Sequence, residues 1–441
     1  KSILVRYFFL CLIISCSRRA YIKIEDKSKM NGIFKRSLIA LTCSSVLLLA
    51  ACNDEDDGWR YSSSSNYLSE KTYNLDKMPG AASVKVMTYN MPNVLGQTKK
   101  ATAMVFVPNK PRPANGWKIV VWEHGTVGIG DSCAPSNNAF NPRFKNMAES
   151  LLAQGYVIIA PDYEGLGTPG IHPYLNLSSA AKSAIQAVKA YKEHYGTQVN
   201  GAWMSVGQSQ GGHGVLGTAE FSNNDANYKG TVAGAPASSL GYIISTVAPL
   251  AIQNLLQGEN AGLVTKGTAI EVYAELLAYA AYTTVGVKAY EPRFNCQEIS
   301  QDRSKPIAEY AEGSTGENGL CLAELHDKFA DDIRSYLNEN TNKTVLDYPG
   351  LAGEFQENPT VKKFLADNQP ATKKINTPVM IIQGTNDMAV PYVVTDALQK
   401  GLKNLGTNVT FVPAQGASHT QAIVDKNPEL VAFIQQYMPA Q

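Results

Sequence analysis

Residues 202–217 read AWMSVGQSQGGHGVLG and carry the strongest structural signal in the chain. An apolar run typical of a buried strand leads into a glycine-rich helix start. Ser209 stands between them, with Gly207 and Gly211 two positions to either side. Glycine lets the backbone turn sharply where a side chain would clash. The turn would present the serine hydroxyl at a helix N-terminus, where the helix dipole favours negative charge. The pattern therefore predicts a nucleophile elbow, a strained strand-to-helix turn that carries a reactive serine.

Apolar runs alternate with helical segments on both sides of this elbow. The runs are continuous in their hydrophobicity, which indicates strands buried on both faces of a mostly parallel sheet. We expect strands at 84–91 and 101–107 (a hairpin), 118–123, 156–160, 202–206, 230–235, 378–383 and 409–412, and helices at 141–154, 178–195, 210–221, 392–402 and 421–437.

The alternation lapses over residues 238–374, which are helical and irregular. A long helical segment inside an alternating pattern indicates an insertion that covers the sheet. The predicted fold class is α/β, with a mostly parallel central sheet, helices on both faces and an inserted helical cap. We expect the catalytic domain to span 81–237 and 375–441, and the cap or lid to span 238–374.

Two further residues complete a candidate catalytic triad. Asp387 directly follows the apolar run 378–383, and His419 lies on the loop after the run 409–412. The chain order Ser, Asp, His is that of the α/β-hydrolase fold. His419 would take the proton of Ser209 and return it to the leaving group, while Asp387 would orient the imidazole.

The other five histidines fit this role less well, because none follows a late strand after the acid. His194 and His326 are expected to face solvent, and His213 is expected to pack. His172 lies in a loop where it is able to line a pocket, and His124 belongs to the turn discussed next.

An oxyanion hole needs two hydrogen-bond donors. One is expected to be the backbone N–H of Gln210, the residue after the nucleophile. The other should come from the turn His124-Gly125-Thr126, which follows the strand 118–123. We favour the amide of Thr126 over that of Gly125; the alternative is that these residues form only a tight turn.

The loop PDYEGLG follows the strand 156–160 at the same edge of the sheet. Tyr163 is expected to line the acyl site. Asp162 would either hold the oxyanion turn or, as is common for loop aspartates, bond to nearby backbone.

The cap contains the stretch YAELLAYAAY at 273–282, which is apolar on more than one helical face. Packing on a single core surface requires only one such face. We expect Leu276, Leu277 and Tyr282 to form an acyl-binding wall that excludes water. The alternative is a cap that only packs on the sheet.

The N-terminal part is typical of an exported protein. From Met30 the chain has a basic region and a short apolar run that ends in LAAC at Cys52, a pattern resembling a bacterial lipobox. We interpret 30–51 as a lipoprotein signal peptide, Cys52 as the lipidation site, 52–80 as a flexible tether and 1–29 as a non-native upstream extension. A plain secretory signal and a longer anchor are the alternatives. The expected location is the cell envelope, lipid-anchored to a membrane, with secretion as the alternative.

Charge and cysteine content narrow the classes further. The net charge is +1, and removing residues 1–51 leaves −6, with no basic stripe that would indicate nucleic-acid binding. No Cys-x-x-Cys or His-x-x-x-His spacing occurs, so neither a metal site nor a cofactor is expected. Outside the leader and the lipobox the cysteines are Cys133, Cys296 and Cys321. An oxidising compartment permits one disulfide among them, and all three pairings are open.

Four stretches resemble the secretory lipase family of fungi and bacteria: GTVGIGDSCAPS (125–136), PDYEGLGTPGIHPYL (161–175), GQSQGG (207–212) and GTNDMAVP (384–391). The resemblance implies a lid-bearing lipase or carboxylesterase that forms a covalent acyl-enzyme on a lipid or small-molecule ester. It carries the triad onto Ser209, Asp387 and His419. The alternatives are a serine peptidase or amidase on the same fold and a non-catalytic lipoprotein that binds ligands.

Overall fold

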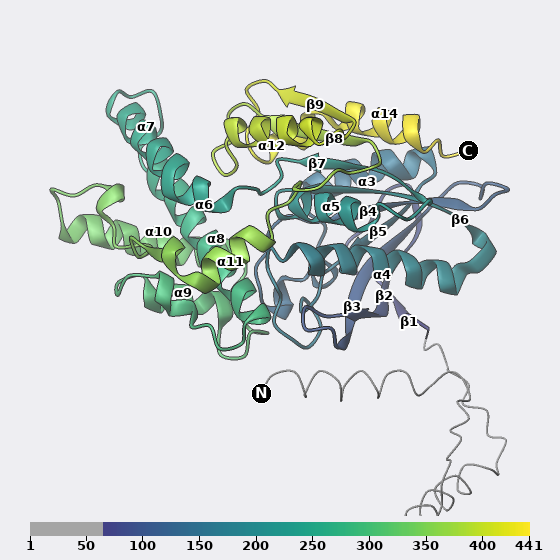
Figure 1. Cartoon of the computed structure of the whole chain (residues 1–441), viewed down its shortest axis with the longest axis horizontal. Coiled ribbons are helices and arrows are strands. Elements are labelled where there is room, and N and C mark those ends of the chain that lie inside the picture. Colours follow the sequence, from purple (N-terminus) through teal and green to yellow (C-terminus); the bar gives the residue numbers. More distant parts are fainter. Residues whose placement is uncertain (1–64) are drawn as a thin grey trace, which may run out of the picture. The chain divides into compact units, whose positions relative to one another are not determined.

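The computed structural model describes residues 65–441. The predicted leader and Cys52 lie outside this range. The described part contains a nine-stranded sheet with the order β1-β2-β3-β5-β4-β6-β7-β8-β9 (Figure 1). The pairs β1–β2, β2–β3 and β3–β5 are antiparallel, and the five pairs from β5–β4 to β8–β9 are parallel.

The strands are β1 (Tyr67–Thr72), β2 (Ala81–Pro92), β3 (Thr98–Pro108), β4 (Trp117–Glu123), β5 (Val157–Pro161), β6 (Val199–Gln208), β7 (Tyr228–Gly234), β8 (Val379–Gly384) and β9 (Val409–Ala414). The helices are α3 (Pro142–Gln154), α4 (Leu177–Tyr195), α5 (Gln210–Phe221), α6 (Leu240–Tyr242), α7 (Ala248–Asn260), α8 (Thr268–Tyr290), α9 (Lys305–Glu312), α10 (Leu322–Glu339), α11 (Pro359–Asp367), α12 (Tyr392–Asn404), α13 (Gln421–Asp425) and α14 (Asn427–Tyr437).

Both faces of the sheet are buried, which explains the continuous apolar runs. Along β4, Val120 belongs to a core shared with α3, α13 and α14, whereas Ile119 and Val121 belong to a core shared with α4, α5 and α12. Successive side chains of a strand point to opposite faces, so a strand covered on both sides is apolar at every position. The predicted doubly covered sheet is confirmed.

All eight predicted strands are present, but the sequence reading missed β1. The predicted tether, 52–80, is wrong over its second half, because β1 pairs with β2, and Tyr73 and Met78 are buried. β1 reads YLSEKT and is an edge strand with most of its residues exposed. An edge strand of this kind lacks the apolar run on which the prediction relied.

The last helix is also shorter than predicted. The expected helix 421–437 is divided at Lys426 into α13 and α14. Pro428 stands in the first turn of α14. Proline has no backbone N–H, and its ring clashes with the carbonyl group four residues earlier, so a single continuous helix cannot form here.

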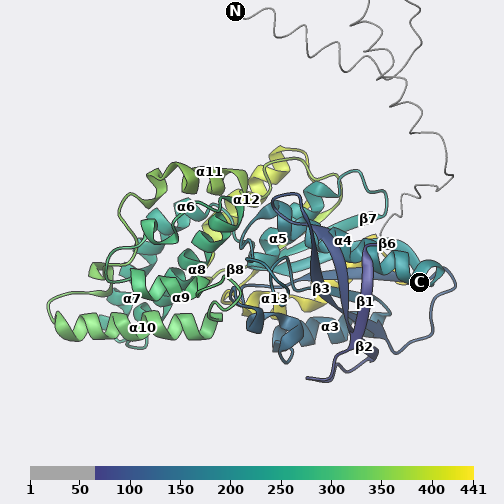
Figure 2. The same ribbon diagram turned by 90° about the horizontal axis from the view of Figure 1, so that it is seen from below.

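The segment between β7 and β8 carries the cap helices α6 to α11, shown in green beside the sheet in Figure 2. The cap has its own core, in which α8 and α10 pack together through residues such as Leu277, Phe329 and Ile333. Among residues 65–441, no helix combines the length and apolarity that crossing a membrane would require.

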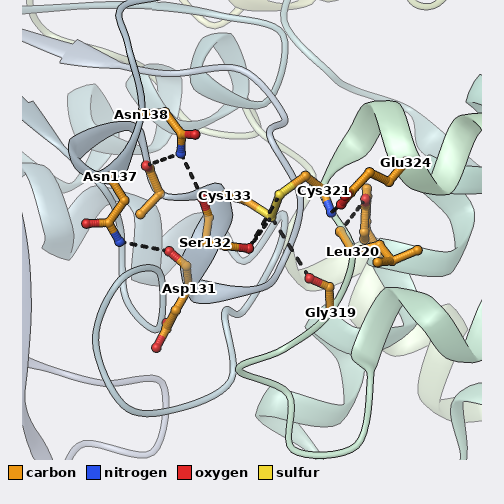
Figure 3. Close-up of a disulfide and its surroundings, with 11 residues drawn as sticks. Asp131, Ser132, Cys133, Asn137, Asn138, Gly319, Leu320, Cys321 and Glu324 are labelled. Atoms are coloured by element: carbon orange, nitrogen blue, oxygen red, sulfur yellow. Dashed lines mark hydrogen bonds between the residues drawn. A yellow bond between two sulfur atoms is a disulfide. The ribbon is translucent and has the colours of Figure 1, made fainter. Parts of the chain in front are cut away.

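A disulfide links the cap to the catalytic part. Cys133, in the loop after β4, is bonded to Cys321 at the start of α10 (Figure 3), and Cys296 is the free cysteine of the described range. Backbone hydrogen bonds run beside it, from Leu322 N–H to the carbonyl of Val127 (2.9 Å) and from Asp131 N–H to that of Glu317 (2.8 Å). The cap is therefore fastened to the loop that follows the predicted oxyanion turn.

Candidate active site

Ser209 lies at the turn between β6 and α5 and has a strained backbone, with φ 61° and ψ −117°. A non-glycine residue in such a conformation costs of order 1–3 kcal/mol, so it persists only where its surroundings impose it. The N–H of Ser209 donates to the carbonyl of Gly234 (2.9 Å), which ties the turn to the end of β7. The predicted nucleophile elbow has the expected conformation.

The two flanking glycines are required by contact distances. A Cβ atom on Gly207 would lie 2.3 Å from the carbonyl oxygen of Gly211, and one on Gly211 would lie 1.8 Å from that of Glu123. Neither distance is sterically tolerable, and the opposing atoms are backbone. The elbow is thus pressed against the end of β4 with no room for a side chain.

Asp387 and His419 are joined by a hydrogen bond of 2.8 Å between Oδ2 and Nδ1. The other carboxylate oxygen of Asp387, Oδ1, accepts from the backbone N–H groups of Ala389 (2.9 Å) and Val390 (2.8 Å). The carboxylate is fully buried, and these contacts fix its direction. It therefore holds the imidazole with Nδ1–H as the donor and Nε2 as the free, basic nitrogen.

His419 is positioned from the elbow itself. The side-chain amide of Gln208, the residue before the nucleophile, donates to the carbonyl of His419 (3.1 Å). The Nε2 atom of His419 is buried and has no hydrogen-bond partner among the described residues. Catalytic hydrogen bonds often form only when substrate is bound, so a free Nε2 at this position is compatible with a general base.

Gln383 contacts the candidate catalytic aspartate and was not predicted from the sequence. Its amide donates to Asp387 Oδ2 (2.9 Å) and to the carbonyl of Val390 (2.9 Å), and its oxygen accepts from the Thr395 hydroxyl (2.7 Å). The side chain is completely buried. The signal was present in the sequence, because a glutamine ends an otherwise apolar strand directly before GTND.

The predicted oxyanion turn lies against the elbow. A Cβ atom on Gly125 would stand 3.2 Å from the carbonyl oxygen of Gln208 and 3.6 Å from Ser209 Cβ, so the turn passes the nucleophile with little space between them. Gln210 is the first residue of α5. The hydroxyl of Thr126 is hydrogen-bonded to that of Tyr174 (2.7 Å).

Tyr163 does not line an acyl site, which corrects the prediction. Its side chain is 1% exposed and offers no surface to a ligand. Its hydroxyl donates to the carbonyl of His124 (2.9 Å), and its ring packs between those of His124 and His172, at centroid distances of 4.3 and 5.8 Å. Tyr163 therefore supports the oxyanion turn from behind.

Asp162 has a structural role, but its carboxylate bonds residues distant in sequence and not the nearby backbone that was expected. Its carboxylate accepts from the backbone N–H of Ser136 (2.9 Å) and the hydroxyl of Thr102 (2.7 Å). These two contacts hold the loop that contains residues 133–136 against β3. Burial raises the pKa of Asp162 to about 6. Its carbonyl, rather than its carboxylate, faces the ring of His124 (3.3 Å).

Three further histidines each make defined contacts. His213 packs as predicted, with Nδ1 3.0 Å from the carbonyl of Ala237, and burial lowers its pKa to about 4. His326 contacts Glu271 and Asp327 on the cap surface. His172 is buried and reaches Gln210, so it does not line an open pocket.

The cap has a partly open cavity of about 740 Å³, lined by cap residues and by none of the triad or oxyanion residues. Its lining is mostly apolar and aromatic and includes Leu276, Leu277, Tyr273 and Tyr348. Tyr282 is not part of this lining. It is fully buried, and its hydroxyl donates to the carbonyl of Leu320 (2.8 Å), so the prediction that it forms an acyl wall is wrong. Some side chains of α8 line the cavity, and others pack in the cap core.

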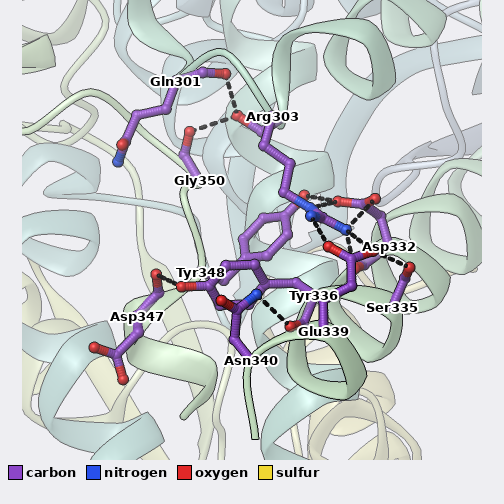
Figure 4. Close-up of polar contacts among 11 residues, drawn as sticks. Gln301, Arg303, Asp332, Ser335, Tyr336, Glu339, Asn340, Asp347, Tyr348 and Gly350 are labelled. Carbon is purple, nitrogen blue, oxygen red and sulfur yellow. Dashed lines mark hydrogen bonds and ion pairs between the residues drawn. The ribbon is translucent and has the colours of Figure 1, made fainter. Parts of the chain in front are cut away.

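A polar network supports the wall of this cavity (Figure 4). Arg303 binds Asp332 (2.9 Å) and Glu339 (2.7 Å), both on α10, and the hydroxyl of Tyr348 donates to Asp332 (2.7 Å). The network fastens the segment that carries Tyr348 to α10.

Comparisons with known proteins agree with this architecture. A family model described as "TAP-like protein" (Abhydrolase_4) matches residues 356–440. A search of curated protein sequences finds no significant match.

Three solved structures share the fold at low identity. The cell wall degrading esterase LipA from Xanthomonas oryzae is 17% identical, with 84% of this chain and 97% of that chain covered and a TM-score of 0.59. A putative hydrolase from Legionella pneumophila is 17% identical, with 84% and 98% covered and a TM-score of 0.63. Candida antarctica lipase A in its closed state is 16% identical, with 85% and 82% covered and a TM-score of 0.60.

The sheet order, the elbow and these likenesses define the class of protein: this chain has the α/β-hydrolase fold. The predicted fold class is confirmed.

Proposed function

We propose that this protein is a serine carboxylester hydrolase, a lipase or esterase that uses Ser209, His419 and Asp387. The observation that carries the proposal is the hydrogen bond of 2.8 Å between Asp387 and His419, made beside the strained turn of Ser209. A carboxylate, an imidazole with a free Nε2 and a serine at a helix N-terminus are the three parts that nucleophilic acyl transfer requires.

The reaction follows from these positions. Ser209 Oγ adds to the ester carbonyl while His419 Nε2 takes its proton, and the carbonyl oxygen becomes an oxyanion. The N–H of Gln210 and an amide of the turn at Gly125 and Thr126 would stabilise that charge. The C–O bond then breaks, and His419 protonates the departing alcohol. Water repeats the sequence on the acyl-enzyme and restores Ser209.

The cap cavity supports an acyl chain as the part of the substrate that is bound. Its volume of about 740 Å³ is in the range of small-molecule sites, and Leu276 and Leu277 contribute apolar surface. The solved structures with the same fold include proteins named as an esterase and as a lipase. Because the cavity is lined by cap residues, an acyl chain bound there would extend from the ester at Ser209 into the cap.

The proposed site of action is a membrane surface of the cell envelope. The lipobox-like sequence at Cys52 supports acylation of that residue and a lipid anchor. Cys52→Ser would release the enzyme from membranes without changing its hydrolysis of soluble esters. Mass spectrometry of the mature N-terminus tests the modification directly.

The decisive experiment compares wild type with Ser209→Ala on p-nitrophenyl esters and on aminoacyl anilides. We expect ester hydrolysis, labelling of Ser209 by a fluorophosphonate and a loss of at least about 10³-fold in kcat for the variant. A preference for anilides would support the peptidase alternative. Absence of both labelling and turnover would support a ligand-binding protein and overturn the proposal.

A further inference from the structure

The loop between β5 and α4 carries three aromatic side chains that each reach one part of the predicted oxyanion hole. Tyr163, His172 and Tyr174 are 1%, 3% and 3% exposed. Their polar atoms contact His124, Gln210 and Thr126, respectively. These three partners belong to the turn and the helix start that would supply both donors.

The contact of His172 with Gln210 has a defined direction. His172 Nδ1 lies 2.8 Å from the carbonyl of Glu164, which is only an acceptor, so Nδ1 carries the proton. Nε2 is then an acceptor and receives the side-chain amide of Gln210 at 3.0 Å. Burial lowers the pKa of His172 to about 3, which keeps the ring neutral. The first residue of α5 is thereby held by its side chain.

The contact of Tyr174 extends from the oxyanion turn to the cap. Its hydroxyl is bonded to the Thr126 hydroxyl (2.7 Å), and its ring packs edge-on against Tyr282 of α8 at 5.8 Å. A Cβ atom on Gly286 of α8 would lie 2.1 Å from the carbonyl oxygen of Tyr174. The same residue is therefore fixed by the cap on one side and touches the turn on the other.

We propose that Tyr163, His172 and Tyr174 form a clamp that positions both halves of the oxyanion hole and couples it to helix α8 of the cap. These are positioning residues, since they act through the carbonyl of His124 and the side chains of Gln210 and Thr126. An oxyanion hole stabilises charge only if its donors are already aimed when the charge forms. The inference rests on the proposed function.

The test uses two variants. Tyr174→Phe keeps the ring and removes the hydroxyl that contacts Thr126. His172→Phe replaces the imidazole by a phenyl ring and removes the contacts with Gln210 and with the carbonyl of Glu164.

Tyr156→Phe is the matched control, because it also removes a buried hydroxyl, which donates to the carbonyl of Met438 (2.6 Å). Tyr156 directly precedes β5 and so lies at the end of the strand opposite to the predicted oxyanion hole. For each protein, kcat and KM are measured on p-nitrophenyl butyrate. The inhibition constant of an alkyl trifluoromethyl ketone, which forms a tetrahedral adduct with the serine, and the melting temperature are measured as well.

We expect both clamp variants to lose about 10-fold or more in kcat, with KM within about threefold of wild type. Their inhibition constants for the ketone should rise by the same factor as kcat/KM falls, because both report the oxyanion. The Tyr156→Phe control should lose comparable thermal stability and keep its kinetics.

An unchanged ketone affinity in Tyr174→Phe would overturn the clamp. An equal loss of kcat in the Tyr156→Phe control would overturn it as well. Tyr174→Phe alone is sufficient if His172→Phe fails to fold. If the wild-type enzyme hydrolyses esters and the clamp variants have the same kinetics, only this inference is rejected. Wild-type protein with no ester hydrolysis and no ketone binding would overturn the proposed function and the clamp together.

Discussion

At the carboxyl edge of the sheet, backbone atoms around Gly207 and Gly211 lie so close together that a Cβ atom would not fit. The cap, by contrast, has a cavity of about 740 Å³. The edge around Ser209 is held by glycines, buried amides and a network through Gln383. The cap is held by a separate apolar core and by the Arg303 network. Under the proposed function, the chemical step would belong to the dense region and the choice of substrate to the cap.

The largest expected effect is at the dense edge. Asp387→Asn should lower kcat by about 10⁴-fold, because an amide would favour the wrong imidazole tautomer, as in the serine-protease precedent. Within residues 65–441, Asp387 is the carboxylate that is hydrogen-bonded to His419. Steady-state kinetics on a soluble ester measures the loss. Asp396, which pairs with Lys400 on the surface, is the control. If Asp396→Asn were inactive and Asp387→Asn active, the triad would have to be redrawn.

The disulfide joins the two regions, and its loss should be the next largest effect. Cys133→Ser should lower the free energy of unfolding by about 3–5 kcal/mol, because the bond closes a sequence separation of 188 residues. Cys296→Ser is the matched control, since Cys296 is unbonded. Denaturant unfolding of both variants measures the difference. Equal stability of the two variants would show that the cap is fastened by its other contacts.

The cap should control chain length and leave the chemical step unchanged. Leu277→Ala enlarges the cavity and should shift the ratio of kcat/KM between long and short esters by roughly 10-fold toward long ones. Leu325→Ala is the control, because Leu325 is equally buried in the cap core and does not line the cavity. A panel of p-nitrophenyl esters from acetate to palmitate gives the profile. The same shift in both variants would mean that the cap affects selectivity only through its stability.

The smallest expected effect concerns Glu123, which lies beneath the elbow. Burial raises the pKa of Glu123 from 4.5 to about 8. The folded protein therefore holds this proton over a pH range in which the unfolded chain has released it. Its contribution to stability is greatest below about pH 4.5 and is lost as pH rises through 8.

Glu123→Gln cannot ionise, so its melting temperature should fall less between pH 5 and pH 9 than that of wild type, by a few degrees. Calorimetry at several pH values measures the two slopes. Parallel slopes would mean that other buried acids, such as Asp162, account for the pH dependence.

Local pattern was enough to predict eight of the nine strands, the elbow at Ser209, and the two residues, Asp387 and His419, that the structure joins by a hydrogen bond. Period and hydrophobicity report burial on one or both faces of an element, and the GxSxG, GTND and GASH stretches each follow a predicted strand. The edge strand β1 and the break at Lys426 were not predicted, because they depend on polar or single-residue signals.

Tertiary structure alone decided which distant residues meet. Cys133 pairs with Cys321 across 188 positions, Gln383 supports Asp387, and Tyr163 turns inward to His124. Tyr282 and Leu276 are six residues apart on α8, yet the first packs in the cap core and the second lines the cavity. The physical reason is that a helical pattern shows that a residue is apolar enough to be buried, while the neighbouring elements determine what it is buried against.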